Sequence, residues 1–159
     1  SRSDGENIRR VAHTASLIEP CDMLINNAIS FYAQTELLFE VWHRWQNIKE
    51  THYIWNISTM MVEEPVNGMP DGQDDLLMSQ YRNQKIALEE ATRQLRHKNN
   101  WPQLSIIRPG GVATQKKFDN TGKADVNKWV KSVIDTFAHN DNILISEISI
   151  GHTKKRIPI

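Results

Sequence analysis

The stretch CDMLINNA, residues 21–28, is the part of the sequence that decides the predicted fold class. It is a short apolar run that ends in two asparagines, and Pro20 closes the helical pattern of residues 6–19 directly before it. Apolar runs of this length are typical of strands that are buried on both faces, and such strands belong to parallel sheets. We therefore expect a parallel strand at residues 21–28 that follows a helix.

Helical and strand-like segments alternate along the rest of the chain. Helical periodicity returns at residues 34–49, 78–97 and 124–138, and strand-like runs occupy residues 52–58, 103–108 and 142–150. This alternation predicts one α/β domain over residues 1–159, a doubly wound parallel sheet with helices on both faces. Residues 60–77 combine proline, glycine and acidic residues without a period, and we expect a long exposed loop there.

The composition excludes several classes of partner. The chain has 159 residues, 39% of them hydrophobic, which is enough for one core and one domain. Its formal net charge of zero offers no basic surface for nucleic acid or an anionic membrane, and its apolar runs are shorter than the roughly 20 residues that cross a bilayer. Cys21 is the only cysteine, so no internal disulfide can form, which favours a cytoplasmic location. We expect Cys21 to be a small buried residue, and we predict no metal site.

Polar and small residues follow the first three predicted strands. They are Asn26 and Asn27, Ser58 and Thr59, and residues 110–114. Because ligands of a parallel sheet bind beyond the carboxyl ends of its strands, these residues mark a candidate binding rim. Tyr81 and Lys85 lie four positions apart at the start of the next helix, so their polar ends converge on one point. Such a pair is either an incidental solvated pair or a proton-transfer device.

Four motifs in this order resemble the short-chain dehydrogenase/reductase family. DMLINNA at 22–28 is similar to the family's Asn-Asn-Ala-Gly strand, and NIST at 56–59 to its catalytic serine strand. YRNQK at 81–85 is similar to its Tyr-x-x-x-Lys motif, and RPGGVAT at 108–114 to its Pro-Gly-x-x-x-Thr segment. The resemblance spans nearly the whole chain and implies a Rossmann-like fold that binds a nicotinamide dinucleotide.

The resemblance implies a catalytic role for four side chains. Tyr81 would be the general acid or base that exchanges a proton with the substrate oxygen while a hydride moves to or from the nicotinamide. A free phenol has a pKa of about 10, and the Lys85 ammonium is expected to lower it. The family's serine falls on Thr59, with Ser58 one residue earlier, and its hydroxyl would orient a carbonyl or secondary alcohol.

The resemblance also implies a set of contacts to NADP or NAD. The expected cofactor-binding residues are Asn27, Ala28, Tyr81, Lys85, Val112, Thr114 and Arg2. In the family, the lysine also holds the hydroxyls of the nicotinamide ribose. Arg2 resembles an arginine that often meets the 2′-phosphate of NADP, which favours NADP over NAD.

The chain departs from the family's pattern in three respects. It contains no G-x-x-x-G-x-G, the Gly-rich turn that cradles the pyrophosphate. Gln34 is the only amide where the family has a further catalytic asparagine, and Ile29 replaces the glycine of the Asn-Asn-Ala-Gly motif. In the family's sheet, the strand that matches residues 21–28 is central. We therefore expect that an N-terminal β-α-β portion is missing from this chain, that another chain covers this edge, or that the fold has rearranged.

Hypotheses from two classes follow. The leading one is an NADP(H)-dependent short-chain oxidoreductase that acts on a small-molecule carbonyl or alcohol. The alternative is a non-catalytic Rossmann-like relic or interaction module that has lost nucleotide binding. A third is an isomerase or dehydratase of the same superfamily, in which threonine is common at the serine position. Helices matching residues 34–49 and 78–97 often form subunit interfaces in the family, which implies a homodimer or homotetramer.

Overall fold

The structure is a computed structural model that describes residues 10–27, 30–48, 50–63, 75–99, 101–112, 123–138 and 144–151. The strands are β1 (Met23–Asn26), β2 (Tyr53–Ile57), β3 (Gln103–Pro109) and β4 (Glu147–Ile150). The helices are α1 (Val11–Ile18), α2 (Ala33–Trp45), α3 (Asp75–Lys98) and α4 (Val126–Ala138), with the short 3-10 helix η2 (Met60–Val62) after β2. Helices and strands follow one another in the predicted order.

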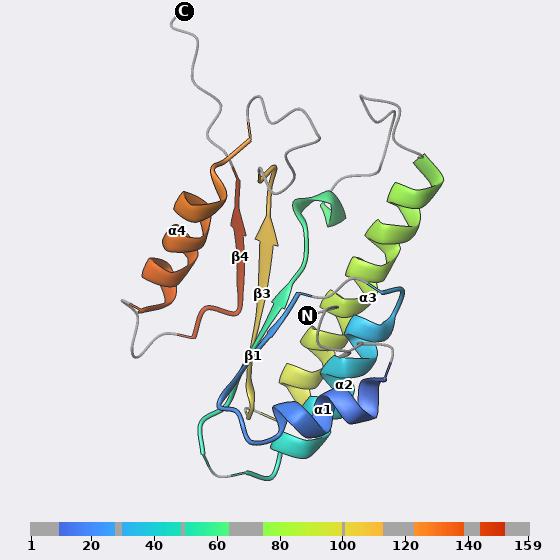
Figure 1. The fold of residues 1–159 in the computed structure, drawn as a ribbon, viewed down its shortest axis with the longest axis vertical. Helices are drawn as coiled ribbons and strands as arrows, with labels where there is room; N and C mark the ends of the chain where they lie inside the picture. Colours follow the sequence, from blue (N-terminus) through green and yellow to red (C-terminus); the bar gives the residue numbers. More distant parts are fainter. Residues whose placement is uncertain are drawn as a thin grey trace, which may run out of the picture.

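The described strands form one parallel sheet in the order β1-β2-β3-β4. Figure 1 shows α1, α2 and α3 on one side of this sheet and α4 on the other. Side chains that alternate along β2 reach both layers. Asn56 Nδ2 donates to Thr92 Oγ1 of α3 at 3.0 Å, whereas the Trp55 ring packs on Phe137 of α4 with 4.2 Å between the ring centroids. The predicted parallel sheet with helices on both faces is confirmed.

The core lies between the sheet and the layer of α1, α2 and α3. Leu37, Leu38, Val41 and Trp45 stand at helical spacing on the inner side of α2 and are at most 4% exposed. Burial of each such side chain stabilises the fold by roughly 1.5–3 kcal/mol. The Trp45 indole also donates to the Glu19 carbonyl at 3.2 Å, which fixes the end of α2 to the end of α1.

Strand β1 lies at an edge of the described sheet. Leu24 and Asn26 are buried, but Met23 and Ile25 are 36% and 56% exposed. The expectation of a strand at residues 21–28 that is buried on both faces is therefore wrong for one face. The reason is that α4, the one described helix on that side, packs over β2 and β4 instead of β1. Cys21, which we expected to be buried, is exposed because it precedes β1 at the same edge.

The predicted boundaries differ clearly at the end of α2 and at the start of β4. Helix α2 ends at Trp45, not at residue 49, because the Ile48 amide donates to the Trp45 carbonyl in a tighter turn that closes the helix. Strand β4 begins at Glu147, where its pairing with β3 starts. Most of the expected loop, residues 64–74, lies outside the described residues. In the described part of the chain, the helices are too short or too polar to span a membrane.

Candidate active site

Three of the predicted catalytic side chains lie where β2 ends beside α3. Thr59 follows β2 with extended backbone and caps η2, and its Oγ1 accepts a hydrogen bond from the Met61 amide at 3.3 Å. The Thr59 side chain also bonds the Tyr81 phenol, which is half-buried in the second turn of α3. Arg82, the next residue of α3, donates to the Met61 and Val62 carbonyls at 2.9 and 3.0 Å. These bonds fasten η2 to α3 and place the Thr59 hydroxyl beside Tyr81.

Lys85 is the third member, and its ammonium is buried. The side chain lies one turn after Tyr81, and the residue is 3% exposed. Its Nζ donates to Gln34 Oε1 at 2.8 Å and to the Ile57 carbonyl at 2.7 Å. Burial disfavours the charged form and lowers the pKa of Lys85 to about 8, while the charge of Glu89 acts in the opposite direction. Lys85 thus carries a charge near pH 7 but loses it readily above pH 8.

The phenol of Tyr81 has a perturbed pKa as well. Burial disfavours the phenolate and raises the pKa of Tyr81 above its ordinary value, and the Thr59 hydrogen bond acts in the opposite direction. We had expected Lys85 to lower this pKa, and that expectation is wrong for this structure. The reason is geometric: Lys85 Nζ lies over the ring, 5.6 Å from its centroid, and donates to Gln34 and Ile57. Tyr81 is therefore a neutral phenol at pH 7, the form that gives a proton.

Gln34 ties the site to the ends of two strands. It is the second residue of α2 and is 4% exposed. Its Oε1 accepts from Lys85, while its Nε2 donates to the Asn26 carbonyl at the end of β1 and, at 3.3 Å, to the Ile57 carbonyl at the end of β2. Asn26 Nδ2 in turn donates to Asn56 Oδ1 at 2.9 Å, which links the end of β1 to the end of β2. The sequence singled out Gln34 as the only amide where the family has a further catalytic asparagine, but nothing in the sequence predicted its contact with Lys85.

Ser58, the fourth predicted catalytic residue, lies away from this group. It is 1% exposed, and its Oγ donates to Glu89 Oε1 at 2.6 Å. Glu89 stands one helical turn beyond Lys85, so the Ser58 hydroxyl faces the interior of the α3–sheet interface and Thr59 faces Tyr81. The structure thus brings together Tyr81, Lys85 and Thr59, and separates Ser58 from them.

The arrangement of helices and strands is similar to that of solved dehydrogenase structures. A short-chain dehydrogenase/reductase from Vibrio parahaemolyticus matches with a TM-score of 0.67 at 15% sequence identity, over 93% of this chain and 75% of that chain. The fold is that of the short-chain dehydrogenases/reductases. This result confirms the Rossmann-like fold that the four motifs implied.

Two further solved structures are similar to this chain in fold. An alcohol dehydrogenase from the archaeon Thermococcus sibiricus, complexed with 5-hydroxy-NADP, matches with a TM-score of 0.66 at 13% identity, over 96% of this chain and 74% of that chain. An NAD-dependent NDP-hexosamine 5,6-dehydratase involved in tunicamycin biosynthesis matches with a TM-score of 0.58 at 12% identity, over 89% of this chain and 58% of that chain. No family model and no curated protein sequence matches this chain.

Two of the expected cofactor residues besides Tyr81 and Lys85 lie on the same rim of the short-chain dehydrogenase/reductase fold. Asn27 is exposed directly after β1, and Val112 is half-buried after β3, where it forms an isolated bridge with Ala124. Both follow the carboxyl ends of parallel strands, as Thr59 does. The remaining expected residues, Ala28, Thr114 and Arg2, lie outside the described residues.

The Pro-Gly part of RPGGVAT has a packing explanation in this fold. A Cβ atom on Gly110 would lie 2.8 Å from Gly151 Cα, closer than Cβ atoms come to backbone in proteins, and at a tight 3.0 Å from Met60 Sδ. Gly110 therefore allows the ends of β3 and β4 to pack against η2. A Cβ atom on Gly111 would meet only Lys123 Cγ, at an ordinary 3.5 Å.

Proposed function

We propose that this protein is an NADP(H)-dependent short-chain oxidoreductase that transfers a hydride between nicotinamide and a carbonyl or secondary alcohol. The observation that carries the proposal is the buried Lys85 ammonium beside the Tyr81 phenol at the carboxyl end of β2. Burying an ammonium is unfavourable for folding, and an apolar side chain would fill the same place without that penalty. A buried lysine retained next to a polar rim is therefore best explained by chemistry.

The protonation states favour carbonyl reduction as the direction. Tyr81 is neutral at pH 7, so it donates its proton to the carbonyl oxygen as the hydride arrives at the carbonyl carbon. The Lys85 ammonium lies beside the ring but is directed to Gln34 and Ile57, so its role in this proposal is to hold the cofactor next to Tyr81. Thr59, which bonds the phenol in this structure, orients the substrate oxygen next to Tyr81.

The residues present fit the nicotinamide end of the cofactor. Lys85 has three N–H donors, and the described residues accept two of them, which leaves one for a ribose hydroxyl. When bound, the cofactor supplies the hydride. Val112 and Thr114 are the proposed neighbours of the nicotinamide. Asn27 and Ala28 are proposed to line the cofactor, and Arg2 to bind the 2′-phosphate of NADP. The alcohol dehydrogenase complexed with 5-hydroxy-NADP supports NADP as the dinucleotide. No Gly-rich turn for the pyrophosphate occurs in the sequence.

Titration of the 159-residue chain with NADPH tests the proposal. We expect NADPH to quench tryptophan fluorescence and to be oxidised in the presence of small aldehydes or ketones. Tyr81→Phe should lower kcat by about 10²–10⁴-fold with little change in NADPH binding, because it removes the proton donor. Lys98→Met, which removes an exposed lysine of the same helix, serves as the control and should change neither. A wild-type chain that binds no NADPH would refute the proposal and favour the non-catalytic relic or interaction module.

A dehydratase is the second candidate, because the serine position holds Thr59. The structural similarity to the NDP-hexosamine 5,6-dehydratase supports this candidate at the level of fold. Incubation with NAD and a nucleotide sugar would separate the dehydratase from the oxidoreductase, since a dehydratase regenerates its dinucleotide within each turnover and an oxidoreductase accumulates the reduced form.

A cytoplasmic location and assembly as a homodimer or homotetramer stay predictions. Exposed Phe39 and Ile86 on the outer sides of α2 and α3 favour assembly.

A further inference from the structure

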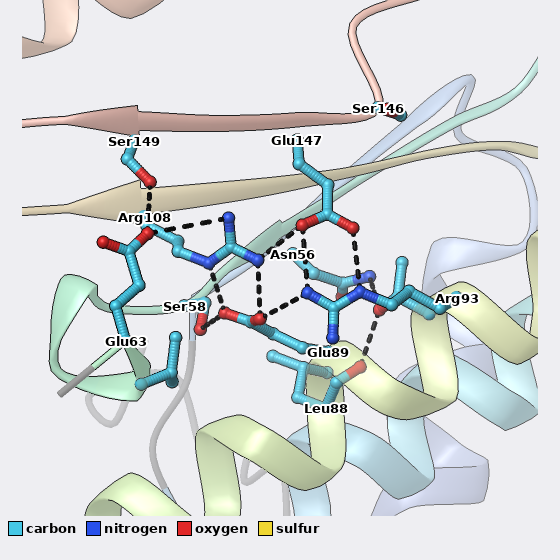
Figure 2. A network of polar contacts seen from close by, with 12 residues as sticks. Asn56, Ser58, Glu63, Leu88, Glu89, Arg93, Arg108, Ser146, Glu147 and Ser149 are labelled. Atoms are coloured by element: carbon cyan, nitrogen blue, oxygen red, sulfur yellow. Dashed lines mark hydrogen bonds and ion pairs between the residues drawn. The ribbon is translucent and has the colours of Figure 1, made fainter. Parts of the chain in front are cut away.

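Arg108 of β3 is the centre of a network that joins the sheet to α3 (Figure 2). Its Nε and one terminal nitrogen donate to the two oxygens of Glu89 at 2.8 and 2.7 Å. The same terminal nitrogen pairs with Glu147 of β4, and Arg93 of α3 donates to both Glu89 and Glu147. Such two-pronged arginine–carboxylate pairs are strong and fix the geometry of both partners. The carboxylate of Glu89 is thus held rigidly between α3 and β3.

Glu89 also holds the segment that carries the proposed site. Its Oε1 accepts from Ser58 Oγ at 2.6 Å, a bond that Figure 2 shows next to the Arg108–Glu89 pair. Ser58 stands between two residues of the site. Ile57 offers the carbonyl that accepts from Lys85, and Thr59 offers the hydroxyl that bonds Tyr81. A carboxylate that fixes Ser58 therefore fixes the backbone on which both contacts depend.

The same carboxylate acts on Lys85 through its charge. Glu89 is one helical turn beyond Lys85, and its negative charge opposes the effect of burial on the pKa of the ammonium. The other elements around Lys85 present no second carboxylate within the described contacts: α2 presents the neutral Gln34, and β2 presents the Ile57 carbonyl. Tyr81 on α3 is neutral at pH 7. The other charged residues of the network are Arg108 and Arg93, which pair with Glu89, and Glu147, which pairs with Arg108.

We propose that Glu89 is a positioning residue of the site: through Ser58 it holds Thr59 toward Tyr81, and it supplies the carboxylate one helical turn from the Lys85 ammonium. The proposal rests on the proposed function for its effect on turnover. The competing explanation is that the network only ties α3 to the sheet. Under that explanation, any carboxylate of the network would matter equally, and Lys85 would be unaffected.

A titration of Lys85 that needs no turnover separates the two explanations. The protein is labelled with lysine carrying ¹³C at Cε, and the Lys85 resonance is assigned by its loss in Lys85→Met. We expect Glu89→Gln to lower the measured pKa of Lys85 by about one pH unit, because it removes the nearest opposite charge but keeps an oxygen for Ser58. Glu147→Gln, which removes a charge from the same network without contacting Ser58, and Glu90→Gln, an exposed neighbour, should leave it unchanged. No change in Glu89→Gln, or an equal change in Glu147→Gln, would overturn the proposal.

Turnover tests the other half of the proposal. Ser58→Ala keeps the charge of Glu89 but removes the bond to the β2 end, so we expect kcat for NADPH-dependent reduction to fall about tenfold while the basic limb of the pH profile stays in place. Glu89→Gln should move that limb to lower pH by the same amount as the Lys85 titration. If Glu89→Gln does not fold, as circular dichroism would show, Ser58→Ala alone decides: an unchanged kcat overturns the proposal. If the chain has no activity at all, the proposed function fails, but the Lys85 titration still tests the effect of Glu89.

Discussion

Replacement of Lys85 by methionine should leave the fold nearly as stable at pH 7 and remove a specific dependence of stability on pH. In the folded chain the pKa of Lys85 is about 8, compared with 10.5 for a free lysine. Between these two values the folded chain has released a proton that the unfolded chain still holds, so unfolding takes up a proton and stability rises with pH. The difference of about 2.5 pH units, at about 1.4 kcal/mol each, corresponds to about 3 kcal/mol gained between pH 8 and 10.5.

At pH 7 two effects of Lys85→Met oppose each other. The variant loses the bonds to Gln34 and Ile57, and leaving these acceptors unpaired costs about 1–3 kcal/mol each. It also avoids the burial of a charge, which in the wild type costs about 3 kcal/mol by the same linkage. We therefore expect the two proteins to differ by less than about 3 kcal/mol at pH 7.

Urea unfolding of both proteins across pH 7 to 10.5 measures the effect. Other groups that titrate in this range are shared by the two proteins, so the difference between their unfolding free energies isolates Lys85. We expect this difference to move by about 3 kcal/mol in favour of the wild type as the pH rises. A difference that stays constant across the range would refute the reasoning, because Lys85 would then have the same pKa in the folded and unfolded chains.

Three further predictions concern stability and association. The pKa of Glu147 is lowered to about 2, first by its bond with Arg93, so its contribution of up to about 3 kcal/mol is present above pH 4.5 and lost as the pH falls toward 2. In Glu147→Gln the melting temperature should fall less between pH 4.5 and pH 2 than it does in the wild type. An equal fall in both proteins would contradict the prediction. Gly110→Ala should destabilise the fold by about 1–3 kcal/mol, because its Cβ would overlap Gly151 Cα, whereas Gly111→Ala should change stability by less than about 0.5 kcal/mol in the same chemical unfolding assay. Equal effects of the two would rule out the close approach. Ile25→Lys on the exposed face of β1 should keep the melting temperature and reduce self-association in light scattering, and a loss of folding would show that this face is covered.

The sequence predicted the order of elements and the parallel sheet because both depend on local periodicity. The motifs also placed Thr59, Tyr81 and Lys85 together, since the ends of parallel strands and the start of the following helix share one edge. The exposure of Ile25 could not be predicted, because an apolar run does not show whether a helix packs on its second face. That depends on where α4, about a hundred residues later, comes to rest.

The polar contacts of the site were equally hidden from the sequence. The bond between Lys85 and Gln34 joins residues 51 positions apart, and the bond between Ser58 and Glu89 joins residues 31 positions apart. The raised pKa of Tyr81 was hidden as well, because it follows from the burial of the phenol in the folded chain. Residue spacing predicted which groups come near one another, but it did not predict which acceptor each donor selects.

Because β1 lies at an edge of the described sheet, hydrogen exchange at its amides can show whether another strand is bound there. Among the described strands β1 pairs only with β2, so amide hydrogens on its outer side have no sheet partner to slow their replacement by deuterium. Any strand that docks there, from the same polypeptide or from a neighbour, would protect those amides selectively and leave the exchange of the β2, β3 and β4 amides nearly untouched. Deuterium uptake at residues 23–26 therefore shows directly, and independently of catalysis, whether a strand is bound at this edge.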